Sequence, residues 1–169
     1  MGTEQLVAVA DAGPIIHLAE IDCLDLLAQF SQLHIPSVVI SEIAGKASGL
    51  PDTLFSLTNL QHHDLPQSLV LTYVNVMSLD SLQAGEQNCL YACSLLGVST
   101  ILTDDLAARR AAKKIGFTPV GTLGIIVRAY RHQRIPLQKA EQCLLNLSKF
   151  STLFVTKTLI DIAIEDLQK

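Results

Sequence analysis

Residues 98–114, with the sequence VSTILTDDLAARRAAKK, contain the feature that most constrains the fold. An apolar run that ends at Leu102 is typical of a buried strand, and after Asp105 the apolar residues recur with the helical period of about 3.6. Asp104 and Asp105 therefore lie where a strand passes into a basic helix. One interpretation is ordinary capping, with Thr103 or Asp104 as the N-cap and Asp105 stabilised by the helix dipole.

A similar junction opens the chain. Residues 6–10 form a near-continuous apolar run, as expected for a strand covered on both faces in a parallel sheet, and Asp11 ends the run. Pro14 favours the first position of the helix that follows, and Asp22 is expected to cap a second short helix. His17 lies on the first helix, where it could face a site near Asp11. Because it has no recognisable nucleophile or orienting partner, packing or surface exposure is expected for it rather than catalysis.

Two further acidic residues belong to predicted helices beside the strands. A brief strand at 33–35 precedes a helix opened by Ser37, and Glu42 lies in the later turns of that helix. Glu86 lies near the start of a helix that ends at Gly97, a usual helix stop. Each glutamate has an ordinary interpretation, as an exposed helical residue or a first-turn acid. Each also lies where a helix can bring it to the edge of the sheet.

The rest of the chain continues the alternation of strands and helices, without internal repeats. The expected elements are a strand at 54–60, a polar turn at 62–64, a helix at 67–78, a strand at 116–120, a helix capped by Thr122, and helices at 137–150 and 156–167. This alternation predicts parallel strands joined by right-handed crossovers, hence an α/β fold of three layers, an α/β/α sandwich. We expect residues 1–169 to form a single domain, with 137–169 as a C-terminal helical extension.

Composition narrows the class of protein. The 169 residues suit one domain, and the formal net charge of −4 excludes nucleic-acid binding by bulk charge, so such binding would need a local patch. The four cysteines show no C-x-x-C pair and are expected to be reduced core residues. No apolar run approaches the roughly 20 residues of a membrane span. The start of the chain lacks the basic region of a secretory signal, so we expect a cytoplasmic protein without membrane contact.

Two basic groups could supply a local patch for nucleic acid. The first follows Asp105 on one helix and comprises Arg109, Arg110, Lys113 and Lys114. The second comprises Arg128, Arg131, His132 and Arg134, with Tyr130 available for stacking on an unpaired base. Such groups can hold a phosphate backbone, although a solvated helix face has the same composition.

The acidic residues together suggest one chemistry. The carboxyl ends of parallel strands meet at one edge of a sheet, where ligands bind. Two like charges about 4 Å apart repel by about 4 kcal/mol at an effective dielectric constant near 20, so protons or a cation must accompany such a cluster. Carboxylate oxygens favour Mg²⁺ or Mn²⁺, and metal-assisted hydrolysis of a phosphodiester is the natural reaction. The predicted catalytic residues, with Asp105 as a ligand or water-positioning base, are Asp11, Glu42, Glu86, Asp104 and Asp105.

Five segments resemble the PIN-domain family, and most closely its DUF3368 branch: VAVADAGPIIHLAEI, IPSVVISEI, AGEQNCLYACSLLG, ILTDDLAARRAAKKIG and VGTLGIIVRAYRHQRI. This branch is similar to the toxin nucleases of bacterial VapBC-type toxin–antitoxin pairs. The resemblance implies a metal-binding quartet formed by Asp11, Glu42, Glu86 and Asp104, with Asp105 beside it. Arg109 and the turn at 121–124 also match the branch. The resemblance further implies an Mg²⁺- or Mn²⁺-dependent endoribonuclease acting on RNA, the toxin of such a pair, with homodimers and a small antitoxin partner.

Two positions depart from the family pattern. Gly13 stands where many PIN nucleases have Ser, Thr or Asn, and Glu86 stands where Asp is common. A catalytically weak PIN-fold binding module that acts through protein or RNA contacts is therefore the alternative. A response-regulator receiver and a haloacid dehalogenase-type phosphatase are disfavoured, because Asp11 lacks the second nearby acid that both classes use.

Overall fold

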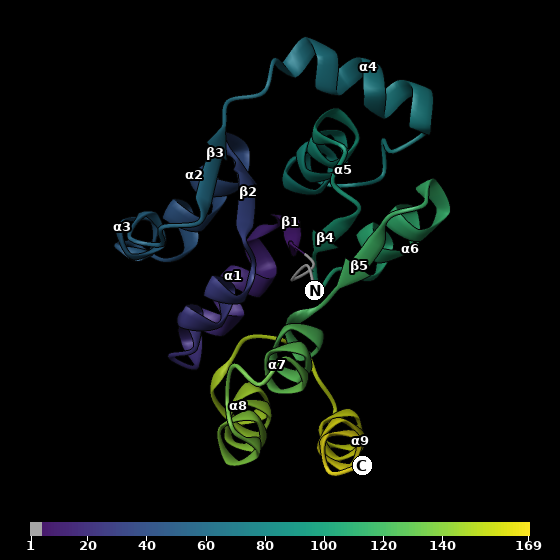
Figure 1. The fold of residues 1–169 in the computed structure, drawn as a ribbon. Coiled ribbons are helices and arrows are strands. Elements are labelled where there is room, and N and C mark those ends of the chain that lie inside the picture. The colour runs from purple at the N-terminus through teal and green to yellow at the C-terminus, as the bar shows by residue number, and fades with distance from the viewer. Residues whose placement is uncertain (1–4) are drawn as a thin grey trace.

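The computed structural model describes residues 5–169, in which five parallel strands form one sheet in the order β3-β2-β1-β4-β5 (Figure 1). The strands are β1 (Val7–Ala10), β2 (Gln32–Pro36), β3 (Leu60–His63), β4 (Thr100–Leu102) and β5 (Thr118–Val120). The all-parallel sheet confirms the predicted α/β class. The expectation about a secretory signal rests partly on residues 1–4, which lie outside the described residues.

Helices cover both faces of the sheet (Figure 1). The helices are α1 (Ala12–Glu20), the 3₁₀-helix η1 (Leu24–Gln29), α2 (Ser37–Lys46), α3 (Leu50–Phe55), α4 (Gln67–Met77), α5 (Ala84–Leu96), α6 (Leu106–Ile115), α7 (Thr122–Arg131), α8 (Leu137–Phe150) and α9 (Lys157–Leu167). On one side of the sheet, helices α1, η1 and α7 contact one another. On the other side, α5 packs on β1, β2 and β4, and α4 packs on the outer surface of α5. This arrangement is the three-layer α/β/α sandwich that the sequence predicts.

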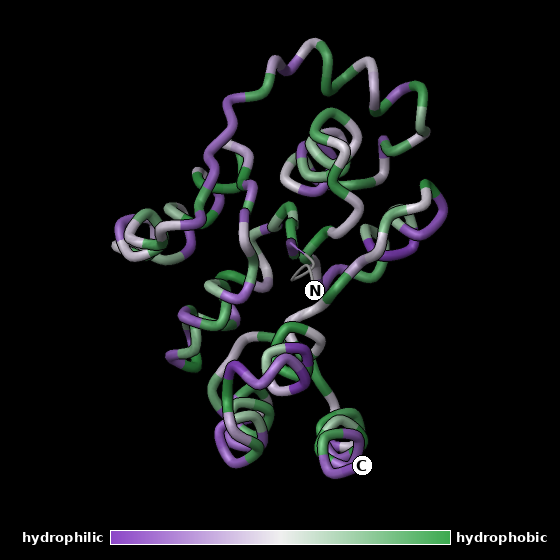
Figure 2. The backbone as a smooth tube through the Cα atoms, viewed as in Figure 1, coloured by the Kyte–Doolittle hydropathy of each residue, from purple (hydrophilic) through white to green (hydrophobic). Residues whose placement is uncertain are grey.

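Strand β1 lies at the centre of the sheet because its side chains are apolar on both faces. Ala8, Val9 and Ala10 are fully buried, and Figure 2 shows hydrophobic colours along β1 and β4 in the middle of the molecule. In the strand order, β2 and β3 lie on one side of β1, and β4 and β5 lie on the other. The direction in which strands are added therefore reverses at β1. Ala10 pairs with Leu102 of β4, and Asp11 N–H donates to Leu102 O at 2.9 Å. The ends of β1 and β4 therefore form the crevice in which α/β sheets bind ligands.

Helix α2 contacts α1 of one layer and α5 of the other, so it lies across the edge of the sheet just beyond β2. This position brings the later turns of α2 toward the ends of β1 and β4. Helices α8 and α9 occupy the expected segments and pack on each other and on α7 (Figure 1). Whether residues 137–169 act as an extension of a single domain stays a prediction. None of the helices in residues 5–169 is both long and apolar enough to cross a membrane.

The predicted strand at 54–60 is wrong. Gly49, in the left-handed region at φ +84°, caps α3, and Pro51 lies in its first turn, so the chain is helical up to Phe55. The strand β3 begins only at Leu60 and includes His62 and His63, where a polar turn was expected. An edge strand has one neighbouring strand and tolerates polar residues, which explains why the sequence conceals β3.

Three predicted helix starts are displaced. Asp11 caps α1, so Pro14 is the third helical residue rather than the first. Asp22 has a left-handed backbone (φ 56°), and the N-cap of η1 is Cys23, whose side chain makes no capping hydrogen bond to the described residues of that helix. Gly121 is the N-cap of α7, and Thr122 is its first residue. In that last case the threonine hydroxyl makes a different contact, described below.

Candidate active site

Asp11 lies at the carboxyl end of β1. Its Oδ1 accepts a hydrogen bond from Ala12 N–H at 2.8 Å, and its Oδ2 accepts one from Thr103 Oγ1 at 3.4 Å. The residue is 7% exposed. Burial, followed by the charges of Glu42 and Glu86, outweighs these hydrogen bonds and raises the pKa of Asp11 to about 7. Asp11 is thus a buried carboxyl group among other acids, an environment that a bound cation would stabilise.

Glu42 reaches the same place from α2. Its Oε1 lies 2.9 Å from Lys46 Nζ, and this ion pair is partly exposed. A Cβ atom on Gly85 would lie 2.8 Å from Glu42 Oε2 and 3.2 Å from Asp11 Oδ1. Oxygens of two carboxyl groups from different elements therefore border one small space at the start of α5, and this space exists because residue 85 has no side chain.

Glu86 follows on the first turn of α5. Its Oε2 accepts a hydrogen bond from Gln83 N–H at 2.9 Å and completes a capping box. Burial raises the pKa of Glu86, and the charges of Asp105 and Glu42 add to this effect against the hydrogen bond from Gln83. Glu86 can therefore be both a first-turn capping residue and a member of the acidic cluster formed with Asp11 and Glu42, because the same carboxyl group caps α5 and lies near the other acids.

Asp104 is held by two residues that the sequence analysis did not place at the site. Thr122 donates to it twice, from N–H to Oδ1 at 2.7 Å and from Oγ1 to Oδ2 at 2.6 Å. His17 Nδ1 lies 2.7 Å from Asp104 Oδ2, and both side chains are largely buried. Burial alone would raise the pKa of Asp104, but the hydrogen bonds from His17 and Thr122 hold it below its ordinary value. Hydrogen bonds thus fix the Asp104 carboxyl group and lower its pKa, whereas burial raises the pKa of Asp11.

His17 and Gly13 lie on the same side of α1, one turn apart. A Cβ atom on Gly13 would lie 3.7 Å from both Asp104 Oδ2 and His17 Cε1. At Gly13, the position that departs from the resembled pattern, no side chain reaches Asp104, and the imidazole of His17 contacts that carboxylate instead. The sequence allowed His17 to face a site near Asp11 but favoured packing or exposure for it, whereas the structure places its imidazole against Asp104.

Asp105 is the N-cap of α6, since its Oδ1 accepts a hydrogen bond from Ala108 N–H at 2.8 Å. The structure thus assigns the cap to Asp105 rather than to Thr103 or Asp104. The side chain is exposed and raises the pKa of Glu86, so it lies at the open side of the acidic cluster.

Arg109 is the basic residue of α6 that turns toward the site. Its Nη1 donates to Thr103 O at 3.1 Å and would lie 3.1 Å from a Cβ atom on Gly121. The same Cβ atom would lie 2.9 Å from Asp104 Oδ1, so residue 121 also leaves room beside the carboxylate. The other basic residues of the predicted patch on this helix are exposed: Arg110, Lys113 and Lys114.

The structure gathers Asp11, Glu42 and Glu86 on one side of the crevice and fixes Asp104 on the other. Within residues 5–169, no three acidic, histidine or cysteine side chains already have the spacing of a complete ligand set. The donors nevertheless fit a hard divalent cation, because they are carboxylate oxygens and because Gly85 leaves space beside the Glu42 and Asp11 oxygens, as Gly121 does beside the Asp104 carboxylate. A cation there would need small movements of the carboxylates or bridging waters.

Comparison with known proteins identifies the family. The family model DUF3368, described as a PIN domain, matches residues 7–169. The chain belongs to the PIN-domain family. PIN domains are generally nucleases, so the chain has a nuclease-type fold and is a hydrolase at that coarse level. No curated protein is similar in sequence to it.

A solved structure is similar to this PIN domain in fold. The crystal structure of PAE2754 from Pyrobaculum aerophilum matches with a TM-score of 0.55 at 16% identity, over 77% of this chain and 99% of that one. At this identity the likeness supports the shared fold alone. The family resemblance and the fold predicted from the sequence are both confirmed.

The four cysteines agree with the sequence prediction. All are buried free thiols: Cys23, Cys89, Cys93 and Cys143. Cys23 Sγ and Cys143 Sγ are 2.9 Å apart, so this contact joins the start of η1 to α8. The other two lie in α5.

Proposed function

We propose that this PIN domain is a Mg²⁺- or Mn²⁺-dependent endoribonuclease that hydrolyses phosphodiester bonds of RNA. The observation that carries the proposal is the convergence of Asp11 and Glu42 oxygens on the position of Gly85, with Glu86 on the same turn of α5 and within range of both charges. Acidic side chains from three separate elements meet there at the crevice where parallel sheets bind ligands.

We assign the acidic residues different roles in the proposed reaction because their surroundings differ. Asp11, Glu42 and Glu86 would hold the cation, which would activate water and neutralise charge that develops on phosphate oxygens. Asp104, kept ionised by Thr122 and His17, would be a further ligand whose orientation the two hydrogen-bonding residues set.

Two residues at the open side of the site complete the proposal. The exposed Asp105 carboxylate, whose Oδ1 caps α6, would orient the attacking water. Arg109 offers a guanidinium to the phosphate beside it. The exposed residues Arg110, Lys113 and Lys114 would attract the RNA backbone over a longer range.

The test is cleavage of a structured RNA pool by the wild type with Mn²⁺, with EDTA, and by Asp104→Asn. We expect cleavage that needs both the metal and Asp104. Asp161→Asn, an exposed change on α9 with the same loss of charge, is the matched control and should cleave as the wild type does. RNA that stays intact with folded wild-type protein and Mn²⁺ would contradict the proposal.

One observation favours a second candidate, a PIN-fold binding module without strong catalysis. Both oxygens of Asp104 already accept hydrogen bonds from the protein, so fewer lone pairs are free for a cation. Titration with Mn²⁺ separates the two candidates. The nuclease should be stabilised thermally by Mn²⁺, whereas the binding module should show neither stabilisation nor cleavage.

The partners form a separate part of the proposal. By resemblance to VapBC-type toxins, we propose a toxin role in a toxin–antitoxin pair, a homodimer, and a small antitoxin that inhibits the nuclease. Light scattering of the purified chain tests the dimer. Co-expression with the product of the neighbouring open reading frame, followed by assay of the purified complex, tests inhibition.

A further inference from the structure

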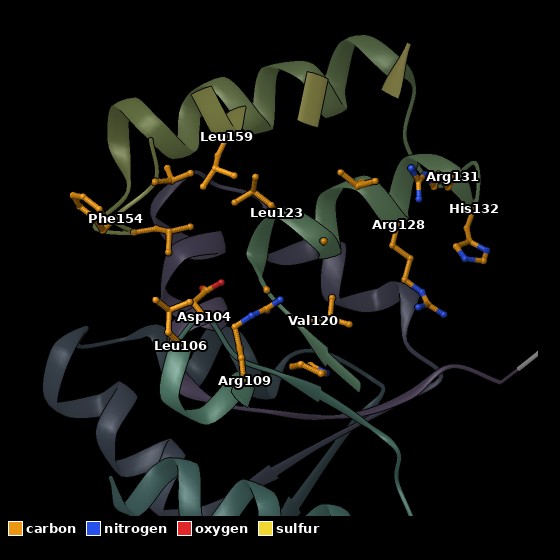
Figure 3. A pocket seen from close by; sticks show the side chains of 16 residues that line it. Asp104, Leu106, Arg109, Val120, Leu123, Arg128, Arg131, His132, Phe154 and Leu159 are labelled. Carbon is orange, nitrogen blue, oxygen red and sulfur yellow. The ribbon is translucent and has the colours of Figure 1, made fainter. Parts of the chain in front are cut away.

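A cavity of about 630 Å³ lies between β5, α6, α7 and the segment that leads into α9 (Figure 3). We propose that this cavity binds an unpaired RNA strand, with phosphates on Arg128 and Arg131 and a base stacked on Phe154. The proposal rests on the proposed nuclease function and specifies its substrate as single-stranded RNA that extends from the acidic crevice into the cavity.

Charge is the first argument. The chain has only five arginines, and three of them line this cavity: Arg109, Arg128 and Arg131. The ion pairs among residues 5–169 involve His17, Lys46 and Lys169, so none of these arginines has a carboxylate partner. Arg128 Nε is buried and finds no hydrogen-bond partner among residues 5–169. In a protein of net charge −4, such a concentration of unpaired cations calls for an anionic ligand.

The walls supply the second argument. Leu106, Phe154 and Leu159 line the cavity and are 66%, 93% and 52% exposed. Large apolar side chains are seldom so exposed together without a binding role. The faces of unpaired bases are apolar and stack on aromatic rings, whereas a duplex keeps its base faces covered. Cations and apolar walls together therefore match a single strand better than a duplex.

Continuity with the site is the third argument, and it selects RNA over an acidic peptide. Asp104 and Arg109 belong both to the acidic crevice and to the cavity lining. In Figure 3, Phe154 lies at one end of the cavity and Arg131 with His132 at the other, while Asp104 and Arg109 lie between them. A strand with a phosphodiester at Asp104 therefore continues directly along this surface.

The predicted second basic patch is thus divided by the structure. Arg128, Arg131 and His132 line the cavity, but Arg134 does not. Tyr130, expected to stack on a base, packs instead against the core. Phe154 takes over the stacking role, and nothing in the local sequence around it signals this.

The test measures binding of a short fluorescein-labelled oligouridylate in EDTA, where the metal-dependent reaction is stopped. We expect the double variant Arg128→Gln/Arg131→Gln to bind the oligouridylate about tenfold more weakly than the wild type. The slope of the logarithm of the association constant against the logarithm of salt concentration should become less negative by about 1.4, since each lost phosphate contact contributes about 0.7. Lys139→Gln/Lys149→Gln, with the same charge change at exposed positions of α8, should change affinity less than twofold. Arg128 is half-buried, so its substitution could disturb folding. The single variant Arg131→Gln changes only an exposed residue and should still bind RNA more weakly than the wild type.

Phe154→Ala tests stacking apart from charge. We expect about fivefold or greater loss of affinity for oligouridylate and no loss for an abasic strand of the same length. Equal affinity of the arginine variants and the wild type for oligouridylate would overturn the proposal. Loss of binding to a polyglutamate peptide in those variants, with RNA binding unchanged, would overturn it in favour of a protein ligand.

The outcomes also separate this proposal from the nuclease function. Wild-type protein that binds RNA through the cavity but never cleaves with Mn²⁺ would support the binding groove and contradict the nuclease. Protein that cleaves with Mn²⁺ while the arginine and Phe154 variants bind RNA normally would support the nuclease and contradict the groove.

Discussion

Gly85→Ala should disable the site while leaving the fold intact. The new Cβ would lie 2.8 Å from Glu42 Oε2 and 3.2 Å from Asp11 Oδ1. Glu42 is on a partly exposed side chain and can swing toward solvent, whereas Asp11 is fixed by its hydrogen bond from Ala12 N–H. The methyl group therefore displaces the Glu42 carboxylate and occupies the space between the two acids.

The expected magnitudes follow from two opposing effects. Alanine is favoured over glycine in helices by up to about 1 kcal/mol, which offsets the contact with the carboxylates. The free energy of unfolding without metal should therefore stay within about 1 kcal/mol of the wild-type value. Mn²⁺ at about 100 times its Kd stabilises by about 2.7 kcal/mol, and a tenfold loss of affinity reduces this to about 1.4 kcal/mol.

Thermal unfolding with and without Mn²⁺ measures both effects. In a chain of this size the wild-type Tm should rise by about 5–10 °C with Mn²⁺, and the rise in Gly85→Ala should be about half as large. Gly45→Ala is the matched control, because among the described residues no atom outside its own helix turn lies within 4 Å of a Cβ atom there. A Gly85→Ala protein with the wild-type Mn²⁺ response and cleavage rate would refute the reasoning.

Three further predictions concern other parts of the chain. Burial, then the neighbouring imidazoles, lowers the pKa of His34 and of His63, so the folded state binds fewer protons than the unfolded state. The urea midpoint should accordingly fall as the pH drops below about 6.5, and less so in His63→Asn. Hydrogen peroxide should oxidise the adjacent thiols of Cys23 and Cys143 to a disulfide, with water as the reduced product; thiol titration would then count two thiols instead of four, and unchanged counts would contradict this. Asp105→Ala should lose about 1 kcal/mol of stability in thermal unfolding, because it removes the cap of α6, while Asp105→Asn should keep most of it.

Much of the fold could be predicted because its strongest signals are local. The apolar run before Asp11 and the run before Asp104 each give a buried strand and place an acid at its end. The helical period then identifies α5 and α6 correctly. Edge strand β3 was missed because its polar residues face solvent, so a strand pattern is absent from the sequence there.

The contacts at the site were harder to predict because they join residues far apart in the chain. His17 and Thr122 meet at Asp104 from 87 and 18 residues away, which no local pattern encodes. Gly85 has the same character, since its importance lies in the atoms it leaves room for. The acidic residues could be named from the sequence, but whether they hold a metal stays a prediction.

The order of the strands has a consequence for synthesis on the ribosome. Strand β1 can pair with β2 as soon as β2 has been synthesised. Its other edge pairs with β4, so Val9 has its strand partner Ile101 only after β4 has emerged. Asp104 is then fixed only when Thr122 has emerged. A nascent chain therefore carries Asp11, Glu42 and Glu86 without a fixed Asp104 until nearly three quarters of its length has left the ribosome. The proposed nuclease would stay inactive until then.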